Sequence, residues 1–97
     1  MPTVVFAPAI ARWLAADPGL SVGERRCAAA GNTVRETLDA VFTEHPTLRG
    51  YVLDERGELR HHVVAFVDGA PVRDKRTLAE PVSPDAEVYV FQALSGG

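Results

Sequence analysis

Residues 33–45 read TVRETLDAVFTEH, and the rest of the architecture follows from this stretch. Thr33 and Glu36 form a capping box, in which each side chain can accept a hydrogen bond from the other residue's unpaired backbone N–H. Apolar side chains then follow at the i, i+4, i+7 and i+8 spacing of one helical face, namely Val34, Leu38, Val41 and Phe42. The spacing predicts an amphipathic helix over residues 33–45, which Pro46 ends.

Segments typical of β-strands flank this helix on both sides. Residues 3–7 (TVVFA) and 25–30 (RRCAAA) precede it and predict a hairpin joined by a long loop. Residues 62–67 (HVVAFV) and 86–93 (AEVYVFQA) follow it, with a short edge strand at residues 70–72 that tolerates proline. The chain order is therefore strand, strand, helix, strand, short strand and final strand.

Turns separate the segments that follow the helix. Asp68-Gly69 is the strongest short hairpin signal in the sequence. Residues 47–60 are interpreted as a polar stretch with a turn at Asp54–Gly57. Leu78 is expected to place one side chain in the core from a short turn.

This order of elements predicts an α+β fold. One helix must cover one face of one sheet, because no other predicted element can bury its apolar side chains. The first and last strands are both strongly apolar, which favours adjacent central positions. We therefore expect residues 1–93 to form a β-grasp (ubiquitin-like) roll, with one mixed sheet and one main helix across one face. Residues 94–97 are expected to form a flexible C-terminal tail.

Composition excludes several classes of function. The 97 residues are enough for one small domain, and the net charge of −3 at pH 7 disfavours a broad electrostatic surface for nucleic acid. No apolar stretch approaches the roughly 20 residues of a membrane span, and the first residues lack the pattern of a signal peptide. Cys27 stands alone, so no internal disulfide is expected. We predict a cytoplasmic protein that binds neither nucleic acid nor membrane.

No side chain suggests an active site of the chain's own. His61 and His62 are neighbours in a predicted strand and would face opposite sides, and neither they nor His45 has a carboxylate or cysteine at ligand spacing. Cys27 is interpreted as a small buried strand residue. The sequence also lacks a glycine-rich phosphate loop. We therefore predict no metal site and no enzymatic activity.

The last strand alternates in a way that predicts a docking surface. Val88 and Val90 point to one face, while Tyr89 and Phe91 point to the other. If the valines face the helix, the two aromatic side chains lie on the open face of the sheet, where Val64 and Phe66 of the neighbouring strand can join them. This surface would either dock a partner protein or be covered by a loop.

The residues beyond this strand complete a recognisable pattern. The order of elements, the ending VYVFQALSGG (residues 88–97) and the terminal Gly96-Gly97 resemble the MoaD/ThiS family of prokaryotic ubiquitin-like sulfur carriers, over nearly the whole chain. The extra residues at 9–23 and 47–60 make it more similar to the longer, cysteine-biosynthetic carrier type and to small archaeal modifiers. Gln92-Ala93 stands where many molybdopterin-synthase small subunits have Pro-Pro.

The resemblance implies a function for the C-terminal carboxylate of Gly97. An ATP-dependent activating enzyme would adenylate it, and a persulfide or sulfide nucleophile would then displace AMP to leave a thiocarboxylate. Leu94, Ser95 and Gly96 would form the tail that enters a partner's narrow channel, which glycine suits because it has no Cβ. The implied partners are an adenylating activating enzyme, a sulfur-donor enzyme and a sulfur-accepting biosynthetic enzyme. ATP would be used by the activating enzyme, and the chain itself would need no cofactor.

Several functions are compatible with such a tail. The favoured one is a sulfur carrier for a biosynthetic pathway leading to cysteine, thiamine, molybdopterin or another sulfur-containing metabolite. A second is a protein modifier joined through Gly97 to lysines of other proteins. A third is the small subunit of molybdopterin synthase, and a fourth is a plain β-grasp interaction domain.

Overall fold

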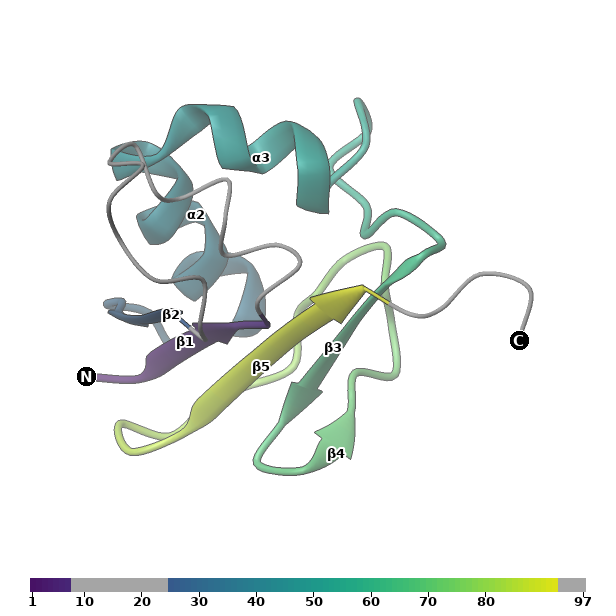
Figure 1. The fold of residues 1–97 in the computed structure, drawn as a ribbon. Helices are drawn as coiled ribbons and strands as arrows, with labels where there is room; N and C mark the ends of the chain where they lie inside the picture. Colours follow the sequence, from purple (N-terminus) through teal and green to yellow (C-terminus); the bar gives the residue numbers. More distant parts are fainter. Residues whose placement is uncertain (8–24, 93–97) are drawn as a thin grey trace.

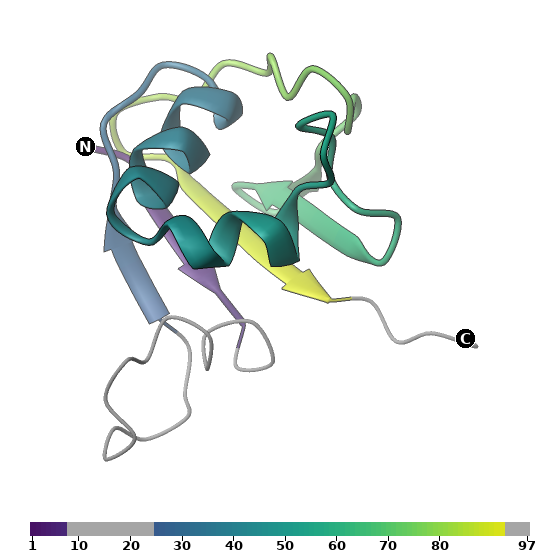
Figure 2. The ribbon, with the colours of Figure 1, turned by 90° about the horizontal axis from the view of Figure 1, so that it is seen from above.

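The computed structural model describes residues 1–7 and 25–92 (Figure 1). The elements in this part of the chain are β1 (Thr3–Phe6), β2 (Arg25–Ala28), α2 (Val34–Glu44), α3 (Pro46–Val52), β3 (Val63–Val67), β4 (Ala70–Pro71) and β5 (Glu87–Gln92). The strands form one sheet, and both helices lie over the same face of it (Figure 2). The predicted α+β, β-grasp architecture is confirmed.

The first and last strands occupy adjacent central positions, as predicted. The strand order is β2-β1-β5-β3-β4, so β1 and β5 each have a neighbour on both sides. These two strands are parallel, with Val4 opposite Val88 and Phe6 opposite Val90, whereas the other pairs are antiparallel. All four of these side chains are fully buried, which explains why both strands read as apolar in the sequence.

Helix α2 follows the predicted pattern closely. The four apolar residues predicted to share one helical face are at most 5% exposed and belong to the core: Val34, Leu38, Val41 and Phe42. The Thr33 side chain caps the helix by accepting a hydrogen bond from the backbone N–H of Glu36 at 3.2 Å. The second hydrogen bond of the expected capping box is shifted by one residue. The Glu36 carboxylate accepts it from the backbone N–H of Asn32, at 2.8 Å, and not from that of Thr33.

A second helix occupies part of the stretch that was interpreted as polar. Pro46 ends the first helix but also begins α3, where its missing N–H costs nothing because the first helical N–H groups have no partner within a helix. Leu48 and Val52 are fully buried and extend the core beyond α2. The reading of residues 47–60 as a polar stretch was therefore wrong in its first half, while the turn at residues 54–57 is present.

The segment between β4 and β5 completes the core, as expected for Leu78. Its side chain is fully buried, and its carbonyl accepts from the backbone N–H of Arg35 at 2.9 Å. The carbonyl of Glu80 accepts from the N–H of Val34 at 3.0 Å. Two N–H groups of the first helical turn that have no partner within α2 are therefore satisfied by this segment.

The β3–β4 hairpin has the predicted turn. Asp68 and Gly69 have φ angles of 49° and 87°, which are left-handed values that a two-residue hairpin turn requires. Phe66 pairs with Pro71 and Val67 with Ala70. The observed strands otherwise differ from the predicted ones by one or two residues at their ends, and the predicted end of the last strand at Ala93 lies outside the described residues.

A membrane span was not expected. Within residues 1–7 and 25–92, no helix combines the length and hydrophobicity that crossing a membrane requires.

Candidate functional site

Strand β5 leads to the predicted working end of the chain. It is held between β1 and β3, and its last residue, Gln92, pairs with Val63. The predicted catalytic residue Gly97 and the predicted tail residues Leu94, Ser95 and Gly96 lie outside the described residues. The structure therefore fixes the strand that precedes them and the surfaces around that strand.

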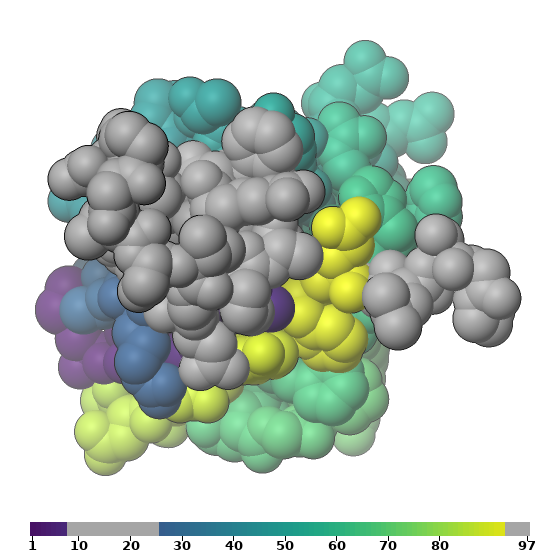
Figure 3. All heavy atoms as spheres, in the orientation of Figure 1, coloured from purple at the N-terminus to yellow at the C-terminus, as the bar shows by residue number. Residues whose placement is uncertain are grey.

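The alternation predicted for β5 is confirmed. Val88 and Val90 are fully buried on the helix-covered face, whereas Tyr89 and Phe91 lie on the opposite face and are half-buried. In the β3–β5 pairing Phe66 lies opposite Tyr89, which places Phe66 on this second face as well. In the space-filling view, yellow atoms of β5 reach the surface beside the green atoms of the β3–β4 region (Figure 3).

The three predicted docking residues form one cluster, which we call the aromatic patch: Phe66, Tyr89 and Phe91. The ring centroids of Phe66 and Phe91 are 5.4 Å apart and those of Tyr89 and Phe91 are 5.6 Å apart, with interplanar angles of 59° and 46°. Tilted rings at this separation are in favourable contact. The geometry brings the three residues together, and their docking role stays a prediction.

Apolar residues flank the aromatic patch, and of these the sequence predicted Val64 but not Val5 or Pro71. Val5 lies beside Tyr89 in the β1–β5 pairing and is only 1% exposed, although it points away from the helices. Pro71 lies opposite Phe66, and Val64 lies opposite Phe91. The register between paired strands determines which residues lie next to one another. The alternation of side chains along a single strand does not reveal that register.

An ion pair borders the patch on the β2 side. The Arg26 guanidinium donates to the Glu87 carboxylate at 2.6 Å, and both side chains are about half exposed. Glu87 lies on the same face as Tyr89, two residues earlier in β5, and Arg26 reaches it across β1. An exposed pair of this kind adds little to stability, so its main consequence is a fixed charge distribution next to the aromatic patch.

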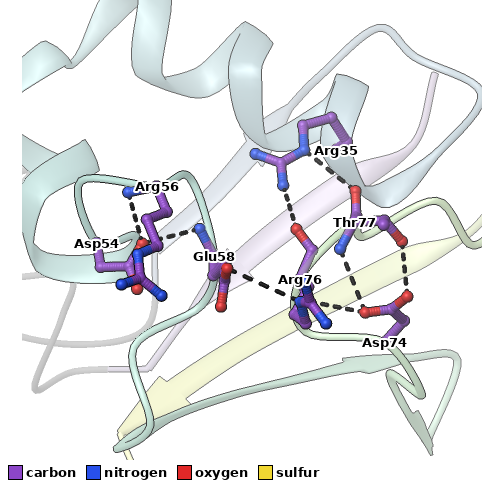
Figure 4. Close-up of polar contacts among 7 residues, drawn as sticks. All are labelled: Arg35, Asp54, Arg56, Glu58, Asp74, Arg76 and Thr77. Atoms are coloured by element: carbon purple, nitrogen blue, oxygen red, sulfur yellow. Dashed lines mark hydrogen bonds and ion pairs between the residues drawn. The ribbon is translucent and has the colours of Figure 1, made fainter.

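The carboxylates of the described loops stabilise turns. Asp54 accepts hydrogen bonds from the backbone N–H groups of Arg56 and Glu58 at 2.8 and 3.1 Å (Figure 4). The bond from Glu58 is the main reason that the pKa of Asp54 lies below its ordinary value. Asp54 is therefore held as a carboxylate and is unsuited to act as a proton donor.

Asp74 is used in the same way. It accepts from the backbone N–H groups of Arg76 and Thr77 and from the Thr77 hydroxyl, and these bonds, that of Arg76 first, lower its pKa. The Arg35 guanidinium donates to the carbonyls of Arg76 and Thr77 at 2.9 and 3.2 Å, so α2 is tied to the same turn (Figure 4). The Asp74 carboxylate and the Arg35 guanidinium therefore stabilise this turn and its contact with α2.

The histidines differ from their expected placement. His61 and His62 precede β3 in a turn instead of alternating within the strand, and their rings meet edge to face at 5.5 Å. In the described part of the chain, no three side chains of His, Cys, Asp or Glu are grouped closely enough to hold a metal ion. The predicted absence of a metal site or cofactor stays a prediction.

Cys27 lies within a strand, as predicted. It is opposite Val4 in the β1–β2 pairing, on the helix-covered face, where it is half-buried and packs against the core. This placement fits a small core residue better than a surface nucleophile.

The sequence matches the model of the ThiS family over residues 20–97, which is most of the chain. The chain belongs to the ThiS family. The predicted resemblance to ThiS/MoaD carriers is thereby confirmed, and membership supports a general role as a sulfur carrier or ubiquitin-like small modifier. A comparison with curated proteins gave no match.

Solved structures similar to this ThiS family protein share its fold. A chain in the crystal structure of the Amycolatopsis orientalis BexX/CysO complex superposes with a TM-score of 0.79 at 21% identity, covering 100% of both chains. Mycobacterium tuberculosis CysO, described as an antigen, has a TM-score of 0.77 at 17% identity over 97% of this chain and 100% of that one. Small archaeal modifier protein 1 of Haloferax volcanii has a TM-score of 0.69 at 22% identity, covering 97% and 100%.

Proposed function

We propose that this ThiS family protein is a sulfur carrier whose working group is the Gly97 carboxylate. An activating enzyme transfers AMP from ATP to this carboxylate and releases pyrophosphate. A hydrosulfide ion then attacks the acyl carbon, the bond to AMP breaks, and a C-terminal thiocarboxylate remains. The observation that carries the proposal is the family match through residue 97, and the half-buried aromatic patch on β3 and β5 supports it.

The chemistry explains why activation by a partner is needed. A C-terminal carboxyl group has a pKa of about 3.5, so at neutral pH it is an anion that nucleophiles do not attack. Adenylation converts the oxygen into part of a good leaving group. ATP is bound by the activating enzyme, and the carrier needs no cofactor of its own.

The structure supports the proposal by showing that the strand before the reactive end is firmly held in the sheet. Strand β5 is anchored by two buried valines, Val88 and Val90, and by pairing on both sides. From Gln92 to Gly97 a chain can span at most roughly 20 Å. That length can bring a carboxylate into a partner's enclosed site while the folded body stays at its entrance.

The aromatic patch is the proposed docking surface for the activating enzyme. Aromatic side chains at the centre of an interface contribute much of its binding energy. Phe91 and Tyr89 are the aromatic residues of the described chain closest in sequence to the reactive end, so a partner that binds them is placed to receive the tail. The sulfur-donor enzyme and the sulfur-accepting biosynthetic enzyme would use the same end of the molecule in turn.

Mass spectrometry of the protein isolated from its host tests the proposal. A sulfur carrier is expected to be present partly as a form whose mass has increased by one exchange of oxygen for sulfur at the C-terminus. Incubation with ATP, sulfide and the cognate activating enzyme should produce the same form. Failure to form it with an enzyme that adenylates the chain would contradict the proposal.

A protein modifier is the second candidate, favoured by the likeness to small archaeal modifier protein 1. It would use the same acyl adenylate, but the final acceptor would be a lysine amine of another protein. An isopeptide bond from Gly97 to a foreign lysine, found by peptide mass spectrometry, identifies this function.

A further inference from the structure

The chain carries its positive charge almost entirely on arginine. Lys75 is the only lysine among its ten basic residues, and the other nine are arginines. A guanidinium group stays protonated in proteins and has no nucleophilic nitrogen at neutral pH, whereas a deprotonated lysine amine is a good nucleophile. The distinction matters for a protein whose terminus is an activated acyl group, so the inference rests on the proposed function.

Lys75 is tied to residues 59–61 through both its main chain and its side chain. Its carbonyl accepts a hydrogen bond from the N–H of Leu59 at 2.9 Å. Its ammonium nitrogen lies 3.3 Å from the carbonyl oxygen of Arg60 and 3.5 Å from that of His61. The residue as a whole is half-buried.

The segment that holds Lys75 is itself well anchored. Leu59 is 5% exposed and belongs to the core. The backbone N–H of Arg60 donates to the carbonyl of Val52 at 3.1 Å, and its guanidinium donates to the carbonyl of Gly50 at 2.8 Å. Arg60, whose carbonyl oxygen is the nearer of the two that face the ammonium group, is therefore held against α3.

Acylation of Lys75 requires that its amine first break its contacts with the carbonyl oxygens of Arg60 and His61. The amine must lose a proton and turn its lone pair towards the incoming acyl carbon, so it must leave both carbonyl oxygens. A carbonyl that loses a charged donor loses a hydrogen bond stronger than a neutral one. The amine is thus less available than one on an exposed, unrestrained side chain.

We propose that Lys75 is a protected amine, and that activated copies of the chain for this reason do not become joined through its side chain. The prevented reaction is attack of an amine nitrogen on the acyl carbon of Gly97. A C–N bond would form, the bond to AMP would break, AMP would leave with the electron pair, and the amine proton would pass to water. Its product would be two copies joined by an isopeptide bond, and the acyl group would be lost to sulfur transfer.

The side-chain thiol that could compete, that of Cys27, is half-buried. Cys27 faces the helix-covered side of the sheet and packs against the core. The basic side chains of the protein are thus arginines apart from Lys75, and the N-terminal amine of Met1 is the remaining amine of the described body.

A chemical experiment tests the protection of Lys75 without any activating enzyme. The wild-type chain and an R73K/K75R variant are treated with a limiting amount of the N-hydroxysuccinimide ester of acetic acid, which acetylates amines. Peptide mass spectrometry then measures the extent of acetylation at each lysine. The variant keeps one lysine and the same charge, but places the lysine at an exposed position two residues away. Lys75 should react about tenfold more slowly than the introduced lysine in the folded proteins, and at the same rate in urea. Equal rates in the folded proteins would overturn the proposal.

A second experiment measures acylation between copies. Both proteins are prepared with a C-terminal thioester, an activated acyl group that needs no enzyme, and are incubated at mildly alkaline pH. The wild-type thioester should hydrolyse without lysine-linked dimers, whereas the variant should form dimers joined at the introduced lysine. Wild-type dimers mapped to Lys75 at the rate of the variant would contradict the proposal. Because neither experiment uses the activating enzyme, failure of the proposed function would leave both results interpretable.

Discussion

Phe66 lies directly opposite Tyr89 in the antiparallel pairing of β3 and β5, and both rings are packed next to that of Phe91. The contact joins the strand that leads to the C-terminus with its neighbour, on the face of the sheet opposite α2 and α3. A partner that binds one ring therefore meets a surface built from two strands.

Replacing Phe91 by glutamate should weaken recognition by the activating enzyme while leaving the fold intact. Its side chain is half-buried on the face opposite α2 and α3, so a charge there removes an apolar contact with a partner more than it disturbs the core. Loss of such an anchor costs about 1–2 kcal/mol or more of binding energy, and the KM for the carrier in ATP–pyrophosphate exchange should rise about tenfold or more.

Thr47→Glu is a suitable control for this variant. It adds the same charge at an exposed position on α3, on the other side of the sheet, and should leave the KM unchanged. If Phe91→Glu unfolds the protein in circular dichroism, Phe91 belongs to the core and the docking role is wrong.

Leu38→Ala should destabilise the fold by about 2–5 kcal/mol, because it leaves a cavity between α2 and the sheet. Leu38 is fully buried in the core. The free energy of unfolding in urea measures the loss. Asp39→Ala, an exposed neighbour, should change it by no more than about 0.5 kcal/mol. Similar values for the two variants would contradict the described packing.

The two turn aspartates should make stability depend on acid pH. The pKa values of Asp54 and Asp74 are lower in the folded protein than their ordinary value of 3.8, so the unfolded chain binds protons more readily. Their contribution is fully present above that value and is lost as the pH falls through the lowered folded pKa. Urea unfolding of the wild type and of Asp54→Asn and Asp74→Asn should show a difference at pH 7 that shrinks below about pH 4. A difference that stays constant with pH would argue against the lowered pKa values.

Much of the fold could be predicted because its local signals agree with its packing. Helix α2 has a cap and a clear apolar stripe, and the alternation of β5 separates Val88 and Val90 from the aromatic side chains. Helix α3 was missed because it is short and only two of its side chains, Leu48 and Val52, are buried. Its position depends on packing against the rest of the core, which a local pattern does not contain.

The sequence likewise predicted some features of the candidate site and missed others. Side-chain alternation placed Tyr89 and Phe91 correctly, but the burial of Val5 beside them depends on the parallel register of β1 and β5. The histidines were misplaced because β3 begins at Val63, two residues after His61, and alternation applies only within a strand. Strand ends and strand register are tertiary properties.

The measurement that bears on the carboxylate chemistry is ATP–pyrophosphate exchange with the cognate activating enzyme, followed by the mass of the carrier after sulfide is added. The wild type should gain sulfur, and so should Cys27→Ala, because no side chain takes part. A chain lacking Gly97, or one extended by a residue after it, should gain none, with a melting temperature close to that of the wild type. Full thiocarboxylate formation by the chain lacking Gly97, or its loss in a folded Cys27→Ala variant, would contradict the proposed function.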